Sequence, residues 1–566
     1  MRELAAQVRR AVAAAWCVAA AECTRTVDVP LPELAGAERQ VAAKIGSARD
    51  AVLQHPDAAA AWGYLGTVLD AHEFLDTALV CYRRAERLDP SDFRWPYLAG
   101  VIVANDAPGD AVALFERAAA VRSQYAPIRW NLASALVRAG RDEDGRRAYE
   151  AALDVQPTCR KALLGLGELT LRQGALRESV RYLRRAADLH FYDREVHSLL
   201  ARVYRALGDK ERAAVEARLV TAYHEVAAVD DPVRAAVADE AVSAYGYYRR
   251  GVTLLDQRAY ARAERAFRHV IALRSDPYAG DLLNLGQALA GLGRLDEAVA
   301  AFESGLAIDP DDPELHNTYG VVLADAGRLD DAMRHFQAAV RIDPRSDAAR
   351  FNIAAALQRQ GRLDDAIQAY RETIAINQAH AKAHARLGNL LALRRDIDAA
   401  MSHWRHAITY DHNHYEATLR LAFAYADRGR FDETNRILRW GVKRAPDNPL
   451  MLAGLASLLA TCPEPEYRNG FEAVRLARRL LKRVGRRHVP SLNLLAAALA
   501  ETGEFGAAVE ASHEAIALAR AARDDAAIAD VRERLAYYER GMPYRTLAKP
   551  TTIAERSPNP VPPLRP

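Results

Sequence analysis

A period of 34 residues runs through the middle of the chain. It is clearest in three consecutive stretches, GRLDEAVAAFESGLAIDPDD (293–312), GRLDDAMRHFQAAVRIDPRS (327–346) and GRLDDAIQAYRETIAINQAH (361–380). Self-similarity at a short, fixed period indicates a stack of small supersecondary units, in which each unit buries its apolar face only against its neighbours.

One position of each unit is always small. We number it position 8, and in thirteen successive units it is occupied by Gly66, Gly100, Ala133, Gly167, Ala201, Gly251, Gly286, Gly320, Ala354, Gly388, Ala422, Ala456 and Ala496. Position 20 is nearly always small as well, and position 24 is aromatic in eight units, from Tyr82 to Trp404. Two antiparallel helices can cross closely where small residues face each other, and a larger side chain at position 8 would overpack that contact.

This pattern resembles the tetratricopeptide-repeat family, of bacterial type, from about residue 59 to residue 522. A Gly at position 15 and a Pro at position 32 suit the ends of a first and a second helix. The turn CPEPEYRNGFEAVRLA (462–477) also resembles one that recurs in bacterial members. The resemblance implies an all-α fold, a right-handed superhelical solenoid of about thirteen helix–turn–helix units.

Two irregularities and two distinct ends divide the chain. Residues 228–243 (AVDDPVRAAVADEAVS) break the register, and the twelfth unit has a longer turn at 462–465. The predicted segments are a signal peptide (1–21), a linker with an N-terminal capping helix (22–58), a first array of five repeats (59–227), the register break (228–243), a second array of eight repeats (244–522), a C-terminal capping helix (523–540) and a Pro-rich disordered tail (541–566).

The N-terminus has the pattern of a secretory signal. Basic residues up to Arg10 precede the uncharged stretch Ala11–Ala21. The pattern favours a periplasmic or envelope-associated protein over a cytoplasmic one. The alternative is a cytoplasmic amphipathic helix. The rest of the chain has no run of about 18 apolar residues, so we expect no integral membrane span beyond this segment.

Composition and motifs argue against catalysis. The sequence contains no GxxxxGK[ST] loop, HExxH, GxSxG or CxxC motif, and its five cysteines are scattered. We therefore expect no enzyme activity, no catalytic residues and no cofactor. The formal net charge of +3 gives no reason to expect a nucleic-acid partner.

Six histidines fall in or beside the tenth unit: His380, His384, His403, His406, His412 and His414. Spacings of three and four residues on a helix can present a pair of imidazoles to a metal ion. However, His384 occupies position 4, which His197 and His316 share, so we interpret it as a packing residue. His403 and His406 are expected to face solvent on the opposite side of the unit. The prediction is therefore no metal site.

Ligand binding is expected on the concave groove, which the first helix of each unit lines in this family through positions 2, 5, 9, 12 and 13. Asn at position 6 binds an extended peptide backbone in some members. The candidate groove residues of the first array are Arg94, Tyr97, Trp130, Asn131, Arg138, Lys161, Arg172, Arg202 and Arg205. Those of the second array are Tyr245, Tyr248, Asn284, Glu314, Asp325, Phe351, Asn352, Phe423 and Asp427.

The groove positions of the two arrays differ in charge. The first array has six basic against three acidic side chains, and the second has two basic against six acidic. This predicts two separable sites, for acidic-aromatic segments on 59–227 and for basic-aromatic segments on 244–522. The alternative is that these charges belong to ordinary solvated helix faces.

The predicted function is a non-catalytic scaffold that binds a protein or peptide in the concave groove. Two alternatives remain: a regulatory or carrier subunit of an enzyme or export complex, such as a glycosyltransferase supplied in trans, and an envelope-tethered structural protein.

Overall fold

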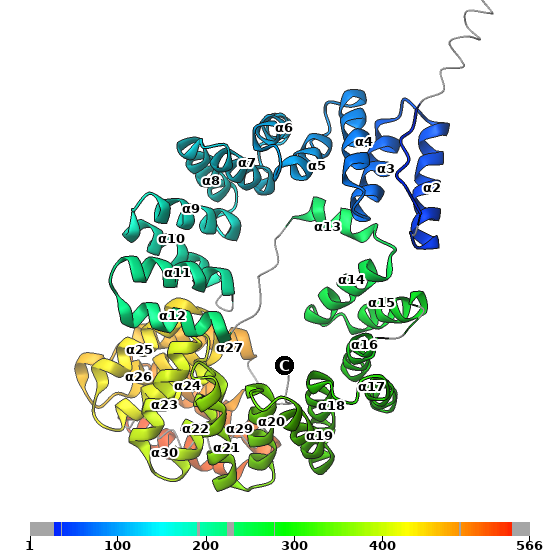
Figure 1. Ribbon diagram of the computed structural model, residues 1–566. Helices are drawn as coiled ribbons and strands as arrows, with labels where there is room; N and C mark the ends of the chain where they lie inside the picture. Colours follow the sequence, from blue (N-terminus) through cyan, green and yellow to red (C-terminus); the bar gives the residue numbers. More distant parts are fainter. Residues whose placement is uncertain are drawn as a thin grey trace, which may run out of the picture. The chain divides into compact units, whose positions relative to one another are not determined.

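The computed structural model describes residues 28–35, 37–189, 193–222, 231–274, 276, 278–485 and 488–545. Within these ranges the chain is all-α, with 29 α-helices, one short 3-10 helix and no strand (Figure 1). The predicted signal peptide and most of the predicted tail lie outside the described residues.

Most helices alternate as the first and second members of successive pairs. The first members are α3 (Ala59–Ala71), α5 (Arg94–Val103), α7 (Ala126–Arg138), α9 (Arg160–Arg172), α11 (Arg194–Ala206), α14 (Ala244–Asp256), α16 (Ala279–Gly291), α18 (Pro313–Asp325), α20 (Asp347–Arg359), α22 (Ala381–Leu393), α24 (Tyr415–Ala426), α26 (Pro449–Thr461) and α28 (Val489–Glu501).

The second members follow after short turns. They are α4 (Leu75–Leu88), α6 (Pro108–Val121), α8 (Asp142–Val155), α10 (Leu176–Leu189), α12 (Lys210–Ala222), α15 (Tyr260–Leu273), α17 (Leu295–Ile308), α19 (Leu329–Ile342), α21 (Leu363–Ile376), α23 (Ile397–Tyr410), α25 (Phe431–Arg444), α27 (Gly470–Val484) and α29 (Phe505–Ala521). Neighbouring helices pack on each other along the chain, which is the arrangement of a tetratricopeptide-repeat solenoid.

Three α-helices stand outside these pairs: α2 (Arg39–Gln54), α13 (Pro232–Asp239) and α30 (Asp525–Tyr538). The longer turn of the twelfth pair contains the 3-10 helix η1 (Pro465–Tyr467). The first of these helices packs on α3 and the last on α29. The segment that breaks the repeat register thus contains a helix of its own.

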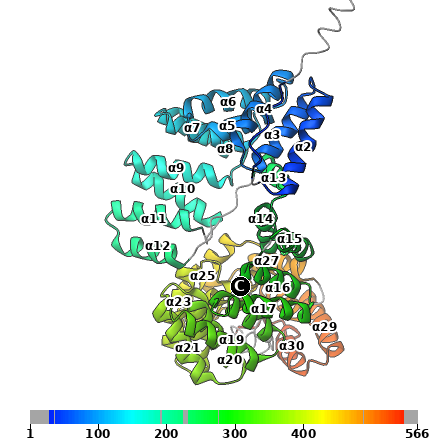
Figure 2. The same ribbon diagram turned by 45° about the vertical axis from the view of Figure 1, so that its right-hand side comes forward.

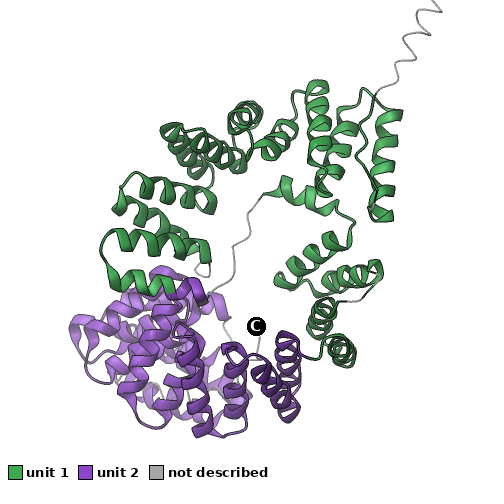
Figure 3. Cartoon of the chain, in the orientation of Figure 1, with its two compact units in different colours: residues 1–217, 224–310 green, residues 218–223, 311–566 purple. Residues whose placement is uncertain are grey.

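The chain divides into two compact units (Figure 3). One comprises residues 1–217 and 224–310, and the other residues 218–223 and 311–566. The division at residues 310 and 311 falls inside the predicted second array, so the units do not coincide with the two arrays. Each unit is described by itself below.

The small residue at position 8 lies under the ring at position 24 of the same pair. A Cβ atom added to Gly320 would lie 2.6 Å from Phe336, and one added to Gly286 would lie 2.6 Å from Phe302. Both phenylalanines are fully buried. The ring therefore rests directly on the backbone of the first helix, which explains why position 8 accepts only small residues.

Most of the first helices end on a residue in the left-handed conformation. Gly327 at position 15 has φ 82°, and its N–H bonds to the carbonyl of Ala324. Glycine adopts this conformation without a Cβ clash. Glu73, Arg258 and Arg395 hold this position in three other units, also with positive φ, whereas the second unit has Ala107 there, with φ −133°, and the twelfth has Pro463.

Candidate functional site: the groove of the first array

The α13 segment, residues 231–243, lies beside α3 in the first unit (Figures 1 and 2). Asp231 caps the helix by accepting a hydrogen bond from the backbone N–H of Arg234, and Pro232 takes the first helical position. These are favoured residues for a helix start. Val237, one turn further on, is 2% exposed and belongs to the same core as the helices α2 to α9.

Two tyrosines hold the carboxylate of Asp231. The hydroxyl of Tyr97 donates to Asp231 Oδ2, and the hydroxyl of Tyr125 donates to Oδ1 at 2.7 Å. Tyr125 also accepts from the backbone N–H of Val233 at 3.2 Å, and Asn131 donates its side-chain amide to the Tyr97 oxygen at 3.1 Å. Because hydrogen bonds to a buried carboxylate are charge-assisted, the two hydroxyls form a strong donor site for an acidic side chain.

Burial raises the pKa of Tyr97, and the negative charge of Asp231 raises it further. Tyr97 therefore keeps its proton at neutral pH and stays a hydrogen-bond donor. Its ring meets that of Tyr125 edge-on, with centroids 5.8 Å apart. Ring packing thus fixes both hydroxyls in the geometry that the carboxylate needs.

A second charged pair lies one turn along α13. Arg234 Nη1 donates to Asp70 Oδ2 at 2.6 Å, and the hydroxyl of Tyr82 donates to the same oxygen at 3.2 Å. The carboxylate of Asp70 is almost fully buried, while the Arg234 side chain is about a third exposed. Burial acts to lower the pKa of Arg234, but the charge and hydrogen bond of Asp70, together with Tyr82 and Tyr97, outweigh it and raise that pKa.

The C-terminal end of the segment is held by polar contacts from α2 and α3. His72 Nε2 accepts from the backbone N–H of Val242 at 3.1 Å, and Lys44 Nζ lies 2.9 Å from a carboxylate oxygen of Glu240. The carboxylate of Glu38 accepts from the N–H of Ala244 at 3.1 Å. The segment is therefore bonded along its whole length, at side chains and at the backbone.

The structure brings two of the predicted first-array groove residues, Tyr97 and Asn131, into this site. Asp70, one of the three acidic side chains at groove positions of the first array, also takes part. Trp130 is partly buried against the core. The remaining predicted side chains lie elsewhere and pair within the chain: Arg94 with Asp92, Arg138 with Asn105, Lys161 with Glu195 at 3.9 Å, Arg172 with Asp142, Arg202 with Glu168 at 4.0 Å, and Arg205 with the carbonyl of Ala201.

Sequence reasoning missed Tyr125, which precedes the first helix of its unit, and the groove-facing side of α13. The available signal was the Asp-Pro start of 231–232 followed by valines four residues apart, Val233 and Val237. That pattern indicates a short helix with one apolar face. It does not say what the face packs against.

The predicted residues of the second array do not gather into one comparable site. Tyr245 is exposed beneath Arg249, Tyr248 meets Phe267 edge-on, and the side chain of Asn284 bonds to its own helix at Gly280. The acidic members Glu314, Asp325 and Asp427 are all exposed.

The apolar and amide members of the second array sit in other surroundings. Phe351 stacks on His380, and the amide of Asn352 donates to Asn317 Oδ1 at 2.8 Å. Phe423 is 3% exposed and packs into the core formed by α24 to α28, so a ligand in a groove does not reach it. The expectation that Phe423 anchors a ligand is a misassignment of a core residue.

The histidines of the tenth unit lie differently from the expectation. His403 and His406 do not face away from His384: the Nδ1 atoms of His384 and His403 are 2.9 Å apart, and the His384 and His406 ring centroids are 5.0 Å apart. In contrast, His380 and His414 cap the starts of α22 and α24 by accepting backbone N–H bonds.

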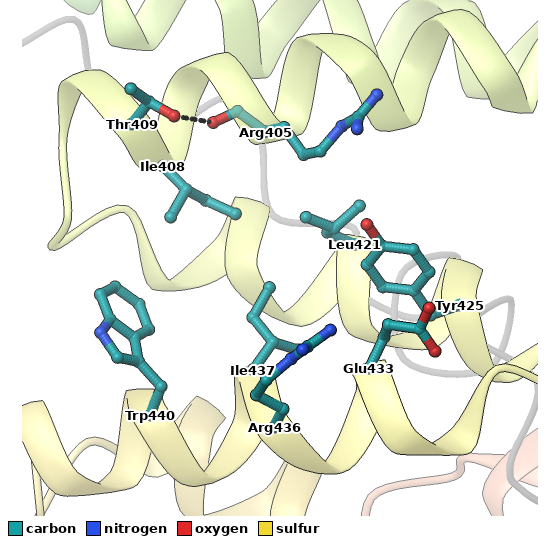
Figure 4. A pocket seen from close by; sticks show the side chains of 9 residues that line it. All are labelled: Arg405, Ile408, Thr409, Leu421, Tyr425, Glu433, Arg436, Ile437 and Trp440. Atoms are coloured by element: carbon teal, nitrogen blue, oxygen red, sulfur yellow. Dashed lines mark hydrogen bonds between the residues drawn. The ribbon is translucent and has the colours of Figure 1, made fainter. Parts of the chain in front are cut away.

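A pocket of about 390 Å³ lies among α23, α24 and α25 of the second unit (Figure 4). Its lining combines apolar side chains such as Ile408, Ile437 and Trp440 with the charged Arg405, Glu433 and Arg436. It holds no arrangement of groups for acid–base or nucleophilic chemistry. None of the described helices combines the length and apolar character needed to cross a membrane.

Comparisons with known proteins agree with the helix pairs. One tetratricopeptide-repeat family model matches residues 130–189 and 283–347, and a second matches 323–390. No curated protein gives a significant match.

Solved structures with likeness to this chain include MamA, PilF of Pseudomonas aeruginosa and the APC/C hetero-tetramer Cut9–Hcn1. MamA is 23% identical over 29% of this chain and 95% of its own, with a TM-score of 0.26. PilF is 14% identical over 38% and 96%, with a TM-score of 0.33. Cut9–Hcn1 is 12% identical over 83% and 96%, with a TM-score of 0.37. Scores this low do not establish a shared function. The family models and the consecutive helix pairs together identify the chain as a tetratricopeptide-repeat protein.

Proposed function

We propose that this protein is a non-catalytic scaffold that binds a segment of a partner protein in the groove of its first array. The bound segment is a short helix with an aspartate at its start and an arginine three residues later. Tyr97, Tyr125 and Asn131 receive the aspartate, and Asp70 with Tyr82 receives the arginine.

The observation that carries this proposal is the α13 segment itself. It bonds to these side chains as an intramolecular ligand would. Its Asp231 is 7% exposed. Aromatic anchors in desolvated pockets supply most of the energy of an interface, and buried charge pairs set its orientation. The groove thus already has the elements of a specific recognition site.

Charge supports the same assignment. The charged side chains of the α13 segment meet opposite charges, since Arg234 pairs with Asp70 and Glu240 pairs with Lys44. Opposite charges across an interface speed association and weaken with salt. A partner segment would therefore compete with the α13 segment by matching both these charges and its Asp-x-x-Arg spacing.

Binding of a labelled peptide to the full chain tests this proposal. The peptide comprises residues 228–243, and the protein is the Asp231→Ala/Arg234→Ala double variant, whose own segment is weakened. We expect saturable binding, measured by fluorescence anisotropy, that weakens as salt is raised. The parent protein should bind the peptide at least about tenfold more weakly, because its tethered segment has a millimolar effective concentration.

Two controls distinguish the proposed contacts from nonspecific binding. A peptide carrying the same two alanines should bind weakly to the double variant. Adding Tyr97→Phe to the variant should also reduce binding of the native peptide, since it removes a hydroxyl donor without removing the ring. Equal binding of both peptides, or no binding of either to a variant with native helical content, would refute the proposal.

A further inference from the structure

Three imidazoles from two helices meet in the tenth unit. His384 projects from α22, and His403 and His406 project from α23 at a spacing of three residues. One ring nitrogen from each lies within 4.8 Å of those of the other two. We propose that His384, His403 and His406 form a binding site for a divalent transition-metal ion of the zinc type.

The spacing of the nitrogens suits such an ion. Zn²⁺ binds imidazole nitrogen at about 2.0–2.1 Å in tetrahedral geometry, which places two nitrogens of one site roughly 3.3 Å apart. The Nδ1 atoms of His384 and His403 are already 2.9 Å apart. His406 completes the set through a modest rotation of an exposed side chain.

The buried member of the cluster is held in the tautomer that a metal needs. His384 Nε2 lies 3.2 Å from the carbonyl oxygen of Gln378, so this nitrogen carries the proton and donates it. Nδ1 is then left with its lone pair toward His403 and His406. Metal-binding histidines typically donate their second nitrogen to a carbonyl or carboxylate in this way.

The three side chains are neutral at physiological pH. Burial is the main cause that lowers the pKa of each, and together with the charges of the neighbouring histidines it takes that of His384 to about 3. A neutral imidazole is the form that binds metal, because the protonated ring has no lone pair to offer.

A matched pair elsewhere in the chain separates packing from metal binding. His316 and His335 hold the corresponding positions two units earlier, with Nδ1 atoms 3.0 Å apart. The position that would correspond to His406 is Ala338. A tilted pair of histidines at these two positions therefore occurs in both units as a packing contact, and the third imidazole is what distinguishes the tenth unit.

The remaining coordination position lies on the exposed side of the cluster, next to His406. Arg371 and Arg405 are near enough for their charges to contribute, after burial, to the lowered pKa values of His403 and His406. Positive charge beside the ion favours an anionic fourth ligand, such as chloride or a carboxylate. An ion in this site would join the two helices of one unit.

The test is a titration of Zn²⁺ alone into untagged, metal-free full-length protein, followed by calorimetry, with Co²⁺ as a spectroscopic substitute. We expect one strong equivalent per chain and a tetrahedral Co²⁺ absorption band. His406→Ala should weaken Zn²⁺ binding by more than about tenfold, because loss even of a group that only supports a ligand costs that much.

His335→Ala is the matched control, since it disrupts the two-histidine pair, and it should leave the affinity and the stoichiometry unchanged. Circular dichroism of both variants checks that the helices persist; the exposed position of His406 makes its replacement tolerable. If the parent protein binds no stoichiometric Zn²⁺, the proposal is wrong. It is equally wrong if His406→Ala binds Zn²⁺ as tightly as the parent.

Discussion

The guanidinium of Arg234 lies 2.6 Å from the carboxylate of Asp70, a residue 164 positions earlier in the chain. This pair and the Tyr97–Asp231 hydrogen bond join the register-breaking segment to α3 and α5, the first helices of the first and second repeats. A segment that interrupts the repeats is thus bonded to their first helices.

Asp231→Ala is expected to release the α13 segment. The substitution removes both the helix cap and the carboxylate that the two tyrosines hold, and loss of a cap alone costs about 1 kcal/mol. Amide hydrogen exchange of residues 232–239 should become much faster, while exchange in α4 and α6 stays slow. Asp239→Ala on the same helix serves as the control, because that carboxylate is largely exposed. Equal exchange rates in both variants would mean that Asp231 does not anchor the segment.

Gly320→Leu should destabilise the second unit. Its side chain would enter the space that Phe336 fills, where a Cβ alone would lie 2.6 Å from the ring. Overpacking of this kind costs about 1–3 kcal/mol, which urea unfolding can measure. Gly506→Leu provides the comparison, since Gly506 is a helical residue with no neighbour within 4 Å of an added Cβ. If both variants unfold at the same urea concentration, position 8 is not the close crossing described above.

The helix pairs were predictable because their determinants repeat. Small residues at position 8, rings at position 24 and glycines at position 15 recur at a fixed spacing, and each contact lies within one unit or between neighbours. The contacts of Asp231 and Arg234 occur once, and they join residues more than a hundred positions apart. No periodicity encodes them, so the sequence indicated a break in the register at 228–243 but neither the helix at 232–239 nor its contacts.

The sequence singled out the histidines of the tenth unit but placed His403 and His406 on the wrong side of it, for a geometric reason. In an antiparallel pair, the small residues at positions 8 and 20 face each other. A step back from position 8 along the first helix is therefore matched by a step forward from position 20 along the second. Position 4 therefore faces the neighbourhood of position 24, where His403 and His406 lie on either side of Trp404. Treating the second helix on its own assigned these two residues to the solvent, whereas the crossing brings them against His384.

Arg395→Gly should stabilise the protein. Arg395 is the residue at position 15 of the tenth unit and has φ 62°, in a place where other units carry glycine. The left-handed conformation costs a side-chain-bearing residue about 1 kcal/mol, and glycine avoids that cost, although the added freedom of its unfolded chain offsets part of the gain. We expect a higher urea midpoint. Gly361→Arg, the reverse change at φ 78°, should lower it. Midpoints that move in the opposite directions would contradict this account of the helix ends.

His335 should make stability depend on pH between its unfolded and folded pKa values. Burial above all, together with the charges of His316, Arg334 and Arg328, lowers its pKa from 6.5 to about 4, against the opposing effect of Asp331. Its ring also contacts Tyr319. Below pH 6.5 the unfolded chain binds a proton at this residue, whereas the folded chain does not until near pH 4. Stability from this residue is therefore present above pH 6.5 and is lost as the pH falls toward 4.

The size of this loss is modest because the ring is only partly buried. Without solvent screening, a shift of one pKa unit changes the free energy of unfolding by about 1.4 kcal/mol. Solvent screens this partly exposed ring, so the change here is smaller. Urea unfolding of metal-free protein at pH 7 and pH 5 measures it. His335→Gln cannot take up the proton, so the variant should lose less stability than the parent between the two pH values, even if its stability at pH 7 is lower. The comparison isolates this residue, since both proteins keep every other histidine. Equal losses would show that His335 titrates alike in the folded and unfolded chains.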